Sequence, residues 1–112
     1  MLQSQTIDKK VAEIRPRFLR LLAQRLNRFE EIRDLLETEP NLAPLLEEIG
    51  TGAHSIVGLA ATLGFPDLGS LAQNVELVVN RVTSAETSTR STIEFFDSID
   101  DLLGEMALIL QA

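Results

Sequence analysis

The sequence predicts an all-α protein: an antiparallel up-down four-helix bundle with a short extra helix at its N-terminal end. Apolar residues recur at spacings of three and four along nearly the whole chain, in segments rich in Leu, Ala, Glu and Arg. There is no Tyr or Trp, no alternating β-branched run and no Asn-Gly or Asp-Gly hairpin signal. Short connections between four long amphipathic segments favour antiparallel neighbours, and therefore a bundle.

The first 38 or so residues predict two helices separated by a proline. A short helix is expected over 6–14, with Ile7, Val11 and Ile14 on one side. Pro16 then either kinks the chain or opens the first turn of the next helix, expected over 17–37. The apolar stripe of that helix is Phe18, Leu22, Leu26, Phe29, Ile32 and Leu36.

A second long helix is expected over 42–63. Asn41 is a candidate N-cap, and Pro44 is tolerated in the first turn. Gly64 ends this helix and Pro66 opens the next one. The apolar sector of the helix over 42–63 comprises Leu45, Ile49, Ile56, Leu59, Ala60 and Leu63.

The remaining chain predicts two more helices. The third carries the stripe Leu68, Leu71, Val75, Val78, Val79 and Val82. The polar stretch 83–91 forms a loop, and Ser91 with Glu94 has the spacing of a capping box. The last stripe is Ile93, Phe96, Ile99, Leu103, Met106 and Leu110.

Composition excludes several functional classes. The 112 residues form a single domain, 1–112, without a membrane-spanning apolar run or an apolar signal region, so we expect a soluble cytoplasmic protein. The absence of cysteine excludes disulfides and thiolate chemistry. The formal net charge of −7 argues against nucleic acid as a partner.

His54 is the residue whose position on its helix is unusual. At about 100° per residue, the centre of the apolar sector lies nearly opposite His54, so the imidazole should face solvent. Gly50 and Gly58 lie four residues before and after it on the same outer strip, whereas Gly52 points inward. A glycine inside a helix costs about 1 kcal/mol relative to alanine. Bare surface around the ring therefore indicates that another molecule approaches it closely.

The surroundings of His54 restrict its chemistry. General acid–base catalysis needs a pocket and an orienting partner, and we expect neither for His54 on the convex surface of a bundle. There is no second histidine, no carboxylate is expected beside the ring, and Glu47 lies two turns away. Metal binding needs convergent ligands, and the positions one turn either side of His54 are glycines, so no metal site is expected. Nucleophilic use remains, because neutral imidazole attacks phosphorus well near pH 7. A partner can supply the phosphoryl donor and the metal ion.

Residues 53–64 resemble the phosphoacceptor helix of histidine-containing phosphotransfer (HPt) domains, with His54, Gly58 and Gly64 matching the family pattern. Leu68, Leu71 and Glu76 resemble the family's next helix. The resemblance covers essentially the whole chain, but only the His54 segment is specific. It implies a four-helix bundle that relays phosphoryl groups between aspartates of response-regulator receiver domains. His54 would be the phosphoacceptor.

The resemblance also implies partners and an interface. The chain would be a monomeric phosphoryl carrier rather than an autonomous enzyme, with a receiver domain, a histidine kinase or both as partners. It would bind no cofactor itself, because Mg²⁺ belongs to the receiver. The expected docking residues are Gly50, Thr51, Val57, Gly58, Ala61 and Phe65.

The chain departs from the family pattern at Val57, where the family usually has a lysine. That lysine helps to balance the charge of the phosphoryl group. Asn74 or Arg81, expected on the flank of the neighbouring helix, are possible phosphate-neighbouring replacements. The departure leaves an alternative open: a degenerate HPt-like module that binds a receiver or kinase without phosphotransfer.

Overall fold

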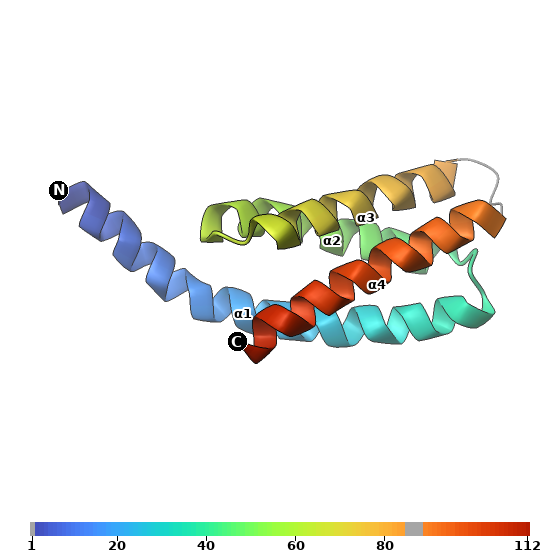
Figure 1. The fold of residues 1–112 in the computed structure, drawn as a ribbon, viewed down its shortest axis with the longest axis horizontal. Coiled ribbons are helices and arrows are strands. Elements are labelled where there is room, and N and C mark those ends of the chain that lie inside the picture. Colours follow the sequence, from blue (N-terminus) through green and yellow to red (C-terminus); the bar gives the residue numbers. More distant parts are fainter. Residues whose placement is uncertain (1, 85–88) are drawn as a thin grey trace.

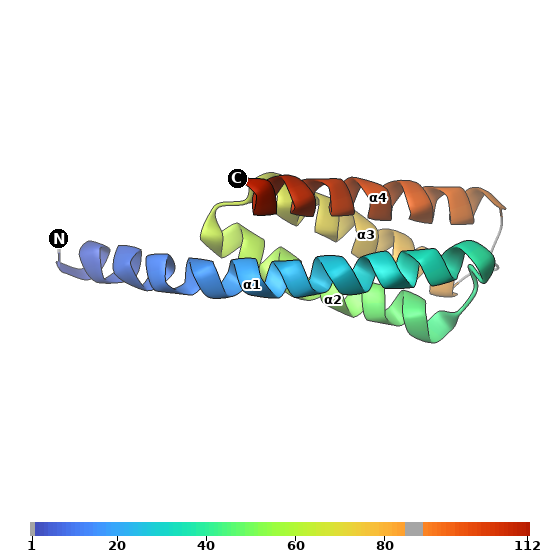
Figure 2. The ribbon, with the colours of Figure 1, turned by 90° about the horizontal axis from the view of Figure 1, so that it is seen from below.

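Four helices make up nearly all of the residues that the computed structural model describes, which are 2–84 and 89–112. They are α1 (Leu2–Thr38), α2 (Ala43–Leu63), α3 (Pro66–Ser84) and α4 (Thr89–Gln111). Each of α2, α3 and α4 packs against its neighbours, and α1 packs against both α4 and α2, which closes the bundle (Figures 1 and 2). This up-down arrangement without strands, in the described part of the chain, confirms the predicted fold class.

Most residues of the predicted apolar stripes form the core, but Leu26, Leu45, Leu59 and Leu71 are only partly buried, and the stripe of the last helix is rotated. Phe18, Leu22, Phe29, Ile32 and Leu36 of α1 are buried as expected. The stripe of α4 is instead Phe95, Ile99, Leu102, Leu103 and Met106, and Ile93 is exposed. The prediction for Ile93 was wrong because Phe95, and not Phe96, packs into the core, which rotates the apolar stripe away from Ile93. The predicted cap was also wrong, since α4 begins at Thr89 and Ser91 lies inside the helix. Residues 85–88 of the expected loop lie outside the described residues.

The extra N-terminal helix is not separate, since α1 is continuous from Leu2 to Thr38 with Pro16 inside it. Proline removes one backbone N–H but its φ is compatible with a helix, so it can kink a helix without ending it. The residues beside Pro16 are held by the α2–α3 turn. Arg15 donates a 2.8 Å hydrogen bond to the carbonyl of Leu63, and Phe18 stacks on Phe65 with ring centroids 5.7 Å apart.

The ends of α2 explain how His54 is placed. Pro44 lies in the first turn as predicted, but the N-cap residue is Leu42, without a side-chain cap hydrogen bond, and not Asn41. At the other end Gly64 adopts the left-handed conformation, with φ of 82°, which glycine reaches without steric cost. The chain then reverses within two residues, so α3 runs back alongside α2.

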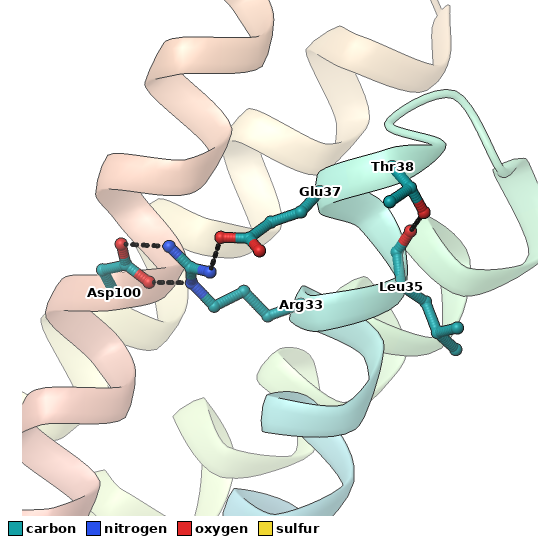
Figure 3. Close-up of polar contacts among 5 residues, drawn as sticks. All are labelled: Arg33, Leu35, Glu37, Thr38 and Asp100. Carbon is teal, nitrogen blue, oxygen red and sulfur yellow. Dashed lines mark hydrogen bonds and ion pairs between the residues drawn. The ribbon is translucent and has the colours of Figure 1, made fainter.

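Ion pairs join α1 to its two neighbours. Arg33 bridges α1 and α4 through a two-pronged contact with Asp100, and it also pairs with Glu37 (Figure 3). Arg28 contacts Glu48 of α2 through two hydrogen bonds, 2.6 and 2.9 Å long. The hydrogen bond from Arg28 lowers the pKa of Glu48, outweighing the opposing effect of burial. These contacts fix α1 along the bundle and leave the outer face of α2 and α3 free.

Candidate functional site

His54 lies in the middle of α2 with its side chain 78% exposed. The adjacent Ala53 and the nearby Ile56 are buried in the core, so they fix the face that α2 turns inward. The imidazole therefore faces solvent, as the helical-wheel argument predicts. Its exposure is a consequence of the apolar periodicity of α2.

Glu76 of α3 is the partner of this histidine that the sequence argument missed. Its Oε2 lies 2.7 Å from Nδ1 of His54, and its side chain is only 28% exposed. A carboxylate accepts hydrogen bonds, so this contact favours the tautomer with hydrogen on Nδ1. In that tautomer Nε2 holds the free lone pair. The expectation that no carboxylate lies beside the ring is therefore wrong.

A shallow hollow lies beside the ring, between α2 and α3. Its volume is about 330 Å³, and it is lined by Glu47, Gly50, Thr51, His54, Glu76, Val79, Asn80 and Thr83. No pocket at His54 was expected from the sequence, because a helical wheel describes the surface of one helix alone. The hollow is formed where α3 lies next to that surface. One side of the imidazole therefore borders this hollow between α2 and α3, and the other side faces solvent.

The three glycines of α2 serve different purposes. A Cβ on Gly50 would lie 3.1 Å from Cγ1 of Val79, so this glycine faces α3 and not open solvent, which corrects its expected position. Gly52 points inward as predicted, where a Cβ would lie 2.6 Å from the ring of Phe29. Gly58 has no atom within 4 Å of the same position. Only Gly58 provides bare surface next to His54.

The other expected docking residues are divided between two faces. Thr51 is exposed beside His54, and Val57 and Ala61 line a second hollow of about 550 Å³ along the α2–α3 groove. Phe65 is directed elsewhere: it stacks on Phe18 and lies beneath the guanidinium of Arg15. Its expected place in the His54 surface is therefore wrong, because the turn after Gly64 turns it toward α1.

Asn74 and Arg81 lie on the other side of α3. Both line the groove between α3 and α4, and Arg81 is 3.8 Å from Glu94 of α4. Neither borders the hollow around His54, so the expectation that they replace the missing lysine is not supported by their positions. The described residues lining that hollow include Glu47 and Glu76 but no Lys or Arg.

The described residues contain neither a membrane-spanning helix nor a cluster of metal ligands. No helix in the described ranges is long and apolar enough to cross a membrane. Among the same residues, no three His, Cys, Asp or Glu side chains are grouped so that they could hold a metal ion.

A helical bundle that presents one exposed histidine, with one ring nitrogen hydrogen-bonded and the other free, has the arrangement of a phosphocarrier module. The family model described as Hpt domain matches residues 17–111, so the chain belongs to the HPt family of two-component phosphotransfer modules. It is also similar to chemotaxis protein CheA of Bacillus subtilis (strain 168), at 27% identity over 78 residues. That match covers 70% of this chain and 11% of the relative's length. No solved structure matches the chain.

Proposed function

We propose that this chain accepts a phosphoryl group on Nε2 of His54 and exchanges it with the aspartate of a response-regulator receiver domain. The observation that carries the proposal is the 2.7 Å contact between Nδ1 and Glu76, on a ring that is otherwise exposed. It orients the ring and leaves Nε2 as the nucleophile. Family membership supports the reaction class, and the geometry supports the atom.

The transfer is a displacement at phosphorus. The Nε2 lone pair forms the N–P bond while the P–O bond to the receiver aspartate breaks, and the electron pair of that bond returns to the carboxylate. The imidazole ring gains positive charge, and the hydrogen on Nδ1 stays in place. Glu76 then faces this charge across a charge-assisted hydrogen bond, which favours the transition state. The reverse reaction follows the same path.

The surface around the ring suits a docked partner. Gly58 offers no side chain, and Thr51, Val57 and Ala61 are small or medium-sized residues around His54. A receiver brings its own aspartate and the Mg²⁺ that neutralises the phosphoryl oxygens. The chain therefore needs only to present the ring, which is the work of a carrier and not of an autonomous enzyme.

The second candidate is a module that binds a receiver or a kinase without transfer. It is favoured by Val57 in place of the family's lysine, together with the two carboxylates, Glu47 and Glu76, that border the hollow. A phosphoryl group beside carboxylates and without a cation is less stabilised. For exposed unit charges about 4 Å apart in water the effect is near 1 kcal/mol, which is less than tenfold in rate. A loss of stabilisation of this magnitude slows phosphotransfer but does not prevent it.

Phosphotransfer from a labelled partner distinguishes the two candidates. The full chain is incubated with phosphorylated receiver domains, or with histidine kinases and ATP, from the same organism. We expect an acid-labile, base-stable phosphate that disappears in His54→Gln. The control is a binding measurement, because the variant should still bind the partner. Binding by both proteins with no label on either would support the second candidate, and label on His54→Gln would overturn the assignment of the acceptor.

A further inference from the structure

The first part of α1 projects beyond the end of the bundle, past the α2–α3 turn and the end of α4 (Figures 1 and 2). We call residues 2–16 the arm. At 1.5 Å per residue the arm is about 22 Å long. The molecule measures 54 × 23 × 20 Å, and the described side chains of residues 9–17 are all exposed. Among the described residues, none buries the side chains of the arm from Ala12 to Pro16.

The apolar stripe of α1 becomes exposed at Ile14, within the arm. Ile14 precedes Phe18 by one turn on the same stripe, yet Phe18 is 3% exposed and Ile14 is 44% exposed. Ile7 and Val11 continue the spacing in the sequence. An apolar stripe on an otherwise polar helix is typical of a face that another element covers.

The exposed area has the size of an interface. A compact monomer of 12.4 kDa is expected to expose roughly 6,100 Å². This chain exposes 7124 Å², an excess on the order of 1,000 Å² over that expectation. A stable interface of standard size removes about 800 Å² from each partner. The radius of gyration, 15.5 Å, likewise exceeds the value of about 13 Å expected for a compact chain of this length.

The charge of the chain is divided between the arm end of α1 and the rest. Seven of the ten basic residues lie within 9–28, whereas fifteen of the seventeen acidic residues lie within 29–112. On the helical wheel, Lys10 and Arg17 lie together on one side of Ile14. No side chain in the described part of the chain forms an ion pair with Lys10, Arg17 or Arg20.

The complementary surface is on α4. Asp97, Asp101 and Glu105 are spaced four residues apart along it and have no ion-pair partner among the described residues. Asp97 and Asp101 line the groove between α3 and α4. The strip ends near Leu108, which is 64% exposed. From Asp97 to the end of α4 the helix is about 21 Å long, which matches the arm.

We propose that a second copy of this chain covers the arm, in a two-fold dimer in which each arm lies along α4 of its partner. Lys10 and Arg17 then face the acidic strip of Asp97, Asp101 and Glu105 on the partner's α4. Two equivalent contacts of this kind form at once, as a closed symmetric pair requires. The sequence predicted a monomer, and it separately predicted a short helix over 6–14, whereas α1 carries these residues outward as part of the arm.

A second copy fits the arm better than an anionic membrane does. The stripe of the arm is aliphatic and has no aromatic residue, and the rest of the chain is strongly acidic and is repelled by an anionic bilayer. The dimer also leaves the hollow at His54 open, because α2 and α3 form that hollow whereas α3 and α4 form the acidic groove. The proposal is therefore independent of phosphotransfer.

Sedimentation equilibrium on the full chain tests the dimer by charge reversal. We expect twice the chain mass of 12.4 kDa, with dissociation favoured by high salt. Lys10→Glu with Arg17→Glu should raise the dimer dissociation constant by about tenfold or more, and so should Asp97→Lys with Asp101→Lys. The four substitutions together should restore the dimer, since the arm is then acidic and the groove basic.

A charge reversal away from the proposed interface provides the control for the dimer experiment. Asp34→Lys changes the same kind of charge on an exposed position of α1 and should leave the dissociation constant unchanged. Circular dichroism checks that each variant keeps its helix content. A monomer at every protein concentration overturns the proposal, as does a dimer that is insensitive to both charge reversals. Binding of monomers to phosphatidylserine vesicles would assign the arm to a membrane instead.

Discussion

Replacing Glu76 with glutamine tests the contact on which the proposed mechanism depends. The substitution keeps the size of the side chain but removes the charge that faces Nδ1 at 2.7 Å. A hydrogen bond to a charged group contributes about 1.5–3 kcal/mol, and a value near the lower end fits a ring as exposed as His54. The glutamine amide can also donate to Nδ1, which favours the tautomer without a lone pair on Nε2. Phosphotransfer should therefore slow by about tenfold.

Single-turnover transfer from a saturating phosphorylated receiver measures this effect without a contribution from docking. Glu47→Gln is the matched control, because Glu47 borders the same hollow and loses the same charge without a hydrogen bond to the ring. The ¹⁵N shifts of the imidazole nitrogens report the tautomer directly. A normal rate in Glu76→Gln, or an equal loss in Glu47→Gln, would refute the proposed role of the contact.

Three further outcomes follow from the structure. Gly58→Gln should slow transfer and should leave the free energy of unfolding unchanged or raise it by up to about 1 kcal/mol. Gly52→Ala should lower the free energy of unfolding by about 1–3 kcal/mol. Denaturant titration measures both changes, and equal effects at the two sites would contradict the packing described. Because Arg28 lowers the pKa of Glu48, that carboxylate adds stability above its ordinary pKa of 4.5 and loses it as the pH falls through the lowered value. Glu48→Gln should therefore lower Tm at pH 7, and the difference in Tm should shrink as the pH falls below 4.5. Val57→Lys should lengthen the lifetime of the phosphohistidine by up to about tenfold in a phosphate-release assay, and an unchanged lifetime would show that the missing cation has no effect.

The helix pattern of the sequence was sufficient to predict the bundle and the outward face of His54. Each of these follows from local periodicity, because a helix in a bundle turns its apolar stripe inward. The turn at Gly64 was predictable for a similar reason, since glycine adopts positive φ at little cost. Ile93 shows the limit of the method: two neighbouring phenylalanines, Phe95 and Phe96, allow two rotations of α4, and only packing selects between them.

The contacts between helices were decided by tertiary structure. Glu76 is 22 residues from His54, and no pattern within α2 reveals that α3 brings its carboxylate to Nδ1. The same is true of Gly50, which faces Val79, and of Arg81, which faces α4. These relations depend on how one helix is rotated against the next, and that rotation is set by the fit of all core side chains together.

The sequence by itself therefore determined which residue is presented to a partner, because a residue's exposure on an amphipathic helix follows from its own neighbours. It also contained the concentration of basic residues within 9–28 and of acidic residues in the rest of the chain. Only the tertiary structure decided which ring nitrogen of His54 is free and that α1 continues through Pro16 into solvent. Both features depend on contacts between segments that are far apart in the sequence, and these contacts form only when the helices pack together.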